Sequence, residues 1–122
     1  MSAEVILVIE DDVHIGGLVS QVLREAGYLP EIVRDVGAAR ALADQGLRPA
    51  AMLSDLMITG SAGPELLGQE LAALFPGVPL TLMTGVPPKR RAAMGVTHAR
   101  VLEKPFELEA LLEAVGVMLR GP

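Results

Sequence analysis

The 122-residue chain contains no cysteine. This absence excludes disulfide bonds, thiol catalysis and zinc sites built from cysteine. It is also compatible with the cytoplasm, where we expect the protein to act.

Aromatic rings and basic charge are scarce as well. The chain has one tyrosine, two phenylalanines and no tryptophan, and its net charge is −5. So few rings count against single-stranded nucleic-acid binding, which relies on stacking. The only basic cluster, Lys89-Arg90-Arg91, is more typical of a solvated helix start than of a phosphate track. We therefore expect no direct contact with nucleic acid.

Long apolar runs are absent too. No stretch approaches the ~20 residues that span a bilayer, and the first four residues do not have the layout of a signal peptide. We therefore expect no membrane insertion. The 51% of hydrophobic residues are mainly aliphatic and suffice for the core of one domain, which we expect to cover residues 1–122.

The chain does contain alternating strand and helix patterns. Short apolar runs predict strands at 5–9, 28–34, 50–55, 78–84 and 100–103. An apolar stripe from Ile15 to Ala26 predicts a first helix, with Asp12 as its N-cap or a first-turn acid and Gly27 ending it. Similar stripes predict helices at 36–45, 64–74 and 106–119. Between 85 and 97, Pro87-Pro88 leaves room only for a short helix at 89–94. Such alternation predicts an α/β fold with a parallel sheet covered on both faces.

Polar side chains stand at the ends of four of these strands: Glu10 and Asp11, Asp55, Thr84, and Lys104. Parallel strands end at one edge of the sheet, where ligands bind in open α/β folds. Clustered carboxylates repel one another unless a cation compensates, and oxygen ligands suit Mg²⁺. We therefore expect a magnesium site at this edge.

Asp55 is the centre of this arrangement. Alone, an acid at a strand end is equally consistent with an ordinary turn. With its neighbours, Asp55 becomes a candidate nucleophile for a phosphoryl group. A metal held by Asp11 and Asp55 would bind one phosphate oxygen, Lys104 would neutralise a second, and Thr84 would donate to a third, as phosphoryl transfer requires.

Four segments carry a family resemblance: 6–12 (ILVIEDD), 54–58 (SDLMI) with Gly60 and Gly63, 82–85 (LMTG) and 102–106 (LEKPF). In order and spacing they resemble the receiver domains of bacterial two-component response regulators. The resemblance implies a flavodoxin-like, doubly wound (βα)5 fold with strand order 2-1-3-4-5. It also implies a cis peptide bond before Pro105. We expect the fourth helix to be short or irregular.

The resemblance also implies roles. Asp55 would accept a phosphoryl group from a phosphohistidine of a sensor histidine kinase or a histidine phosphotransfer protein, in a Mg²⁺-dependent reaction. Asp11 would bind Mg²⁺ directly, Glu10 through water, and Met57 through its backbone carbonyl. The domain would catalyse its own phosphorylation and dephosphorylation without being an enzyme in the usual sense.

By the same resemblance, Thr84 and Lys104 would hold phosphoryl oxygens.

Three features depart from the family pattern: Val101 replaces the usual switch aromatic, Thr59 replaces a common proline, and Pro87-Pro88 interrupts the fourth helix. The usual coupling of a hydroxyl to an aromatic ring is therefore unavailable. The last departure is compatible with a free single-domain regulator or the receiver of a hybrid kinase. With no output domain after Leu119, we do not expect the chain to be a transcription factor by itself.

Two alternatives compete with this interpretation. A phosphohydrolase with an aspartyl nucleophile usually needs a second acid two residues later, where this chain has Met57. A phosphorylation-independent interaction module typically loses the acceptor, an acid of the pair or the lysine, and this chain keeps them all.

Four more residues carry expectations. His14 is expected on a helix surface and His98 in a solvated loop, neither as a ligand. The resemblance also implies that a kinase docks on the first helix. Met57 and Val86 flank the site with apolar side chains, so we expect slow loss of the phosphoryl group.

Overall fold

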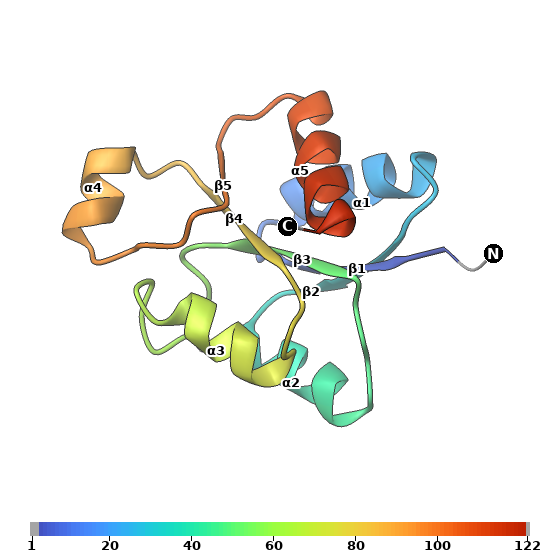
Figure 1. Ribbon diagram of the computed structural model, residues 1–122, viewed down its shortest axis with the longest axis horizontal. Coiled ribbons are helices and arrows are strands. Elements are labelled where there is room, and N and C mark those ends of the chain that lie inside the picture. Colours follow the sequence, from blue (N-terminus) through green and yellow to red (C-terminus); the bar gives the residue numbers. More distant parts are fainter. Residues whose placement is uncertain (1–2, 122) are drawn as a thin grey trace.

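The computed structural model describes residues 3–121, in which five parallel strands form one sheet. The strand order is β2-β1-β3-β4-β5, as predicted (Figure 1). The strands are β1 (Val5–Ile9), β2 (Leu29–Val33), β3 (Ala51–Asp55), β4 (Leu80–Thr84) and β5 (Val101–Glu103). Residues 1, 2 and 122 of the expected domain lie outside the described residues.

The central strand β1 is buried on both faces, which explains its unbroken apolar sequence. Ile6 and Val8 belong to the core under α1 (Val13–Glu25) and α5 (Leu108–Arg120). Leu7 and Ile9 belong to the core under α2 (Val36–Asp44) and α3 (Leu67–Leu74). Figure 1 shows these two helix pairs on opposite faces of the sheet. The fold is therefore the predicted doubly wound α/β arrangement.

Helix ends follow the local sequence. The Asp12 carboxylate caps α1 by accepting hydrogen bonds from the backbone N–H groups of His14 (2.9 Å) and Ile15 (3.1 Å). Gly27 ends this helix with φ of 95°, a conformation that glycine adopts without strain. Both features were predicted, and the cap fixes where the chain turns from the acidic strand end into α1.

Two helix starts were predicted wrongly. α3 begins at Leu67 instead of residue 64, because residues 63–66 form a turn in which the Leu66 N–H donates to the Gly63 carbonyl at 3.0 Å. Leu66 is consequently 38% exposed and not part of the buried face. α5 begins at Leu108 instead of residue 106, and Leu108 is 39% exposed because the buried stripe of this helix starts one turn later, at Leu111.

α4 (Pro88–Ala93) is short, as predicted, but Pro88 is its first residue, a position that the sequence interpretation had denied to helix. Proline is tolerated there because the first turn has no intrahelical use for its N–H. None of the six described residues of α4 is buried, and α4 stands beyond the β4–β5 side of the sheet (Figure 1). Among residues 3–121, no helix has the length and apolar character needed to cross a membrane.

Candidate functional site

Strand pairing brings the predicted polar residues to one edge. Ile9 pairs with Ser54, so Glu10 and Asp55 each follow at the ends of neighbouring strands. Asp55 pairs with Met83, the residue before Thr84. The Lys104 N–H donates to the Thr84 carbonyl at 2.8 Å, which fixes Lys104 beside the end of β4.

Three carboxylates form the centre of the site. Oxygen atoms of Glu10, Asp11 and Asp55 lie within 4.8 Å of one another. Glu10 is buried, Asp55 is half-buried and Asp11 is exposed, so the cluster opens to solvent on one side. This donor set of hard oxygen atoms fits a divalent cation such as Mg²⁺.

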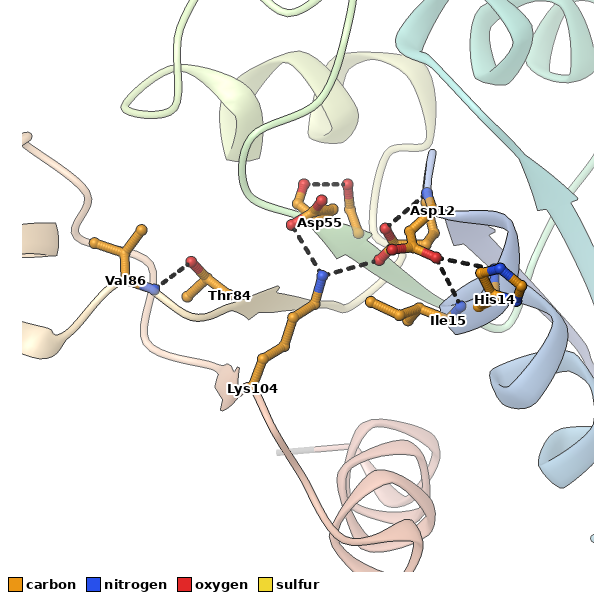
Figure 2. Close-up of polar contacts among 9 residues, drawn as sticks. Asp12, His14, Ile15, Asp55, Thr84, Val86 and Lys104 are labelled. Carbon is orange, nitrogen blue, oxygen red and sulfur yellow. Dashed lines mark hydrogen bonds and ion pairs between the residues drawn. The ribbon is translucent and has the colours of Figure 1, made fainter.

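Lys104 links two of these acids. Its Nζ lies 3.2 Å from Glu10 Oε2 and 3.5 Å from Asp55 Oδ1 (Figure 2). The Glu10 side chain is fully covered, so its second oxygen also needs a partner. Glu10 Oε1 accepts the backbone N–H of Asp12 at 3.1 Å. Glu10 therefore serves to hold Lys104 at the rim, a role that the sequence did not reveal.

One lysine does not neutralise the cluster. Burial raises the pKa of Asp55, Lys104 opposes that rise, and the charge of Asp11 adds to it. Burial also raises the pKa of Glu10, while the hydrogen bond from the Asp12 backbone lowers it. At neutral pH the site is therefore an electrostatically unfavourable concentration of negative charge, which a bound cation would relieve.

Thr84 is buried at the end of β4. Its Oγ1 accepts the backbone N–H of Val86 at 3.0 Å (Figure 2). Since a hydroxyl has one hydrogen to donate and two lone pairs, this contact leaves the Thr84 hydroxyl hydrogen available to a ligand at the rim.

The flanking residues are partly as predicted. His14 is exposed, as expected. His98 is half-buried and therefore only partly solvated, and its Nε2 lies 2.6 Å from the Leu80 carbonyl oxygen. Met57 is 55% exposed beside the site, and Val86 packs partly against the core.

Arg91 is the residue that sequence reasoning missed. It was grouped with Lys89 and Arg90 as a solvated charge, but its side chain is only 13% exposed. Its Nη1 donates to the Val86 carbonyl at 2.7 Å, and its Nη2 lies 3.7 Å from Glu103 Oε1. Nothing in the triplet of basic residues distinguishes Arg91 from its neighbours.

Comparisons with known proteins identify the family and the fold. Residues 6–116 match the family model for the response regulator receiver domain. The chain is 28% identical over 117 residues to the DNA-binding response regulator MtrA of Mycobacterium tuberculosis, covering 94% of this chain and 50% of MtrA. The chain thus spans about half the length of the curated relatives it matches.

Solved structures share the fold. The signal receiver domain of a signal transduction histidine kinase from Syntrophus aciditrophicus is 26% identical with a TM-score of 0.81, covering 98% of this chain and 92% of that chain. The receiver domain of sensor histidine kinase PA1611 from Pseudomonas aeruginosa PAO1, solved with a magnesium ion coordinated in its active site cleft, has a TM-score of 0.83. It is 21% identical and covers 98% of this chain and 100% of that chain.

Proposed function

Because the chain belongs to the family of response regulator receiver domains, whose function in two-component signalling is to accept a phosphoryl group, we propose that Asp55 is the acceptor. The donor is a phosphohistidine of a sensor histidine kinase or a histidine phosphotransfer protein, the kinds of partner that receiver domains have. Members of this family are not enzymes in the usual sense. The catalysis proposed for this chain is limited to its own phosphorylation and dephosphorylation.

The observation that carries the proposal is the bridging position of Lys104 between Glu10 and Asp55. An aspartate that merely ends a strand does not require a lysine that also contacts a buried glutamate. Asp55 is also half-buried at the open side of the carboxylate cluster. A phosphoryl donor can therefore reach Asp55 from solvent, and the positively charged Lys104 already lies beside it to stabilise the charge of the phosphoryl group.

In the proposed reaction, one Asp55 carboxylate oxygen attacks the phosphorus atom of the phosphohistidine. The new P–O bond forms as the P–N bond breaks, and the electron pair of that bond leaves with the imidazole nitrogen. Lys104 stabilises negative charge on one phosphoryl oxygen, and the Thr84 hydroxyl donates a hydrogen bond to another.

Mg²⁺ is the metal that this proposal requires. Asp11 and Asp55 would bind it directly, Glu10 through water, and the Met57 carbonyl as a further ligand. Bound there, the ion would supply compensation for the charge of the carboxylates and the phosphoryl group. The raised pKa values of Glu10 and Asp55 support a need for that charge.

Residues 1–122 would act as one receiver unit in the cytoplasm, where ATP-derived phosphoryl groups are available. The chain itself would make no contact with nucleic acid, in keeping with its net charge of −5.

Incubation with acetyl phosphate and Mg²⁺ tests the proposal. We expect intact-mass spectrometry to show a gain of one phosphoryl group, absent when EDTA removes the metal, and peptide mapping to locate it on residues 51–57. No adduct would favour a phosphorylation-independent interaction module. Rapid multiple turnover of varied phosphate esters would favour a phosphohydrolase.

Met57 should slow the loss of the phosphoryl group. Its exposed apolar side chain stands two residues after Asp55 and offers no hydrogen bond to an attacking water. We expect Met57→Asn to accelerate dephosphorylation about fivefold, the effect of one added hydrogen bond of ~1 kcal/mol. The decay of the adduct after removal of donor measures this rate.

Leu66→Asn is the matched control, because it replaces another exposed apolar residue, in the turn before α3. Its dephosphorylation rate should equal that of the unsubstituted chain. An unchanged rate in Met57→Asn would contradict the shielding role. Val86→Glu is less suitable, because Val86 also packs against the core.

A further inference from the structure

α4 contributes no buried residue to the core. The hydrophobic effect therefore contributes little to holding its six described residues at the sheet. The Arg91 side chain makes a charge-assisted hydrogen bond of 2.7 Å to the Val86 carbonyl, five residues earlier in the chain. α4 is therefore attached to the loop that follows Thr84.

The two contacts of Arg91 differ in strength. Glu103 has a 58% exposed side chain and lies 3.7 Å away, so solvent screens that ion pair and it contributes little. The contact with Val86 is shorter and partly buried. The hydrogen bond to the Val86 carbonyl is therefore the contact that places the Arg91 guanidinium.

Val86 connects Arg91 to the site. The Val86 N–H donates to Thr84 Oγ1 at 3.0 Å, while the Val86 carbonyl accepts from Arg91. Because Pro87 follows, Val86 is already biased toward extended conformations. Fixing its carbonyl from α4 fixes the direction of its N–H further, and the N–H in turn occupies one lone pair of the Thr84 hydroxyl.

We propose that Arg91 is a positioning residue for phosphoryl transfer, which holds Val86 so that the Thr84 hydroxyl hydrogen points to the phosphoryl group on Asp55. The inference rests on the proposed function of Asp55. Val101 offers no aromatic ring on β5 that could pack against Thr84 and fix it. The polar series Arg91–Val86–Thr84 supplies that constraint from α4.

The test is the rate of phosphorylation by acetyl phosphate with Mg²⁺ present. We expect Arg91→Ala to lower this rate about fivefold, the loss that one misdirected hydrogen bond would cause. Arg90→Ala removes the same charge from the exposed neighbouring position of α4 and should leave the rate unchanged. Arg91→Lys, which keeps a donor for the Val86 carbonyl, should recover most of the rate.

A double-variant cycle separates positioning from a general effect on folding. Thr84→Ala should lower the rate by itself, and adding Arg91→Ala should lower it no further, since Arg91 acts through Thr84. A further fivefold loss of rate when Arg91→Ala is added to Thr84→Ala would overturn the role of Arg91, and so would equal rates in Arg91→Ala and Arg90→Ala. Either result would leave the proposed function of Asp55 intact. Failure of the unsubstituted chain to form any adduct would overturn the proposed function and this inference together.

Discussion

Replacing Asp55 by asparagine should abolish the phosphoryl adduct completely. The amide nitrogen and oxygen of asparagine lack the negative charge of the attacking carboxylate, so no acyl phosphate can form. The shape of the side chain is preserved, and Lys104 keeps its 3.2 Å contact with Glu10. Intact-mass spectrometry after incubation with acetyl phosphate and Mg²⁺ measures the result.

Asp44→Asn is the control, because Asp44 is an exposed acid at the end of α2. This variant should form the same adduct as the unsubstituted chain. An adduct of undiminished yield in Asp55→Asn would place the acceptor elsewhere and refute the assignment. Ser54 is a poor alternative acceptor of the phosphoryl group, since it is fully buried and its hydroxyl donates to the Asp55 carbonyl.

The same variant should change stability in a pH-dependent way. The pKa of Asp55 is raised in the folded domain, so folding favours the protonated form. That contribution to stability is present below the pKa of the unfolded chain, near 4, and is lost as pH rises through the raised value of the folded state. Without metal at neutral pH, the ionised Asp55 therefore lowers the free energy of unfolding.

Asparagine removes this penalty. Metal-free Asp55→Asn should be more stable than the unsubstituted chain at pH 7, and the difference should vanish as the pH falls below about 4. The Asp55 charge is one cause of the raised pKa of Glu10, so its removal also relieves Glu10 and acts in the same direction, whereas the lowered pKa of Asp12 has causes other than Asp55. Denaturant unfolding at both pH values measures the difference, and equal stabilities throughout would contradict the electrostatic account.

The sheet and the polar residues at the carboxyl ends of its strands were predicted well, because both follow from short stretches of sequence. A run such as Val5-Ile6-Leu7-Val8-Ile9 is too apolar to lie anywhere except between two helix layers. Once parallel strands were assigned, the positions of Glu10, Asp55 and Thr84 followed from where each run stops. The same patterning predicted the caps at Asp12 and Gly27.

The sequence could not predict which of several similar side chains the folded backbone brings to a particular partner. Arg91 and Arg90 are adjacent and chemically identical, and only the fold decides that Arg91 reaches the Val86 carbonyl. His98 likewise has no local signal for its contact with Leu80, eighteen residues earlier. The start of α3 was misplaced because Pro64 also suits the turn that precedes the helix.

Lys104→Met should separate metal binding from phosphoryl transfer. Lys104 is the only described cation within ion-pair distance of Asp55 and Glu10, and it lowers the pKa of both. Without it, we expect phosphorylation by acetyl phosphate to slow about a hundredfold, the usual consequence of losing one charge-stabilising donor. Affinity for Mg²⁺ should stay the same or rise, because a competing positive charge has left the carboxylate cluster.

The chain contains its own control for this experiment, since Lys89 is its other lysine. Lys89 is exposed on α4, and Lys89→Met removes the same net charge without touching the carboxylates. Rates and calorimetric Mg²⁺ titrations of Lys89→Met should match those of the unsubstituted chain. If Lys104→Met lost Mg²⁺ affinity and phosphorylation in equal measure, Lys104 would act by organising the metal site and not by stabilising the transferred phosphoryl group.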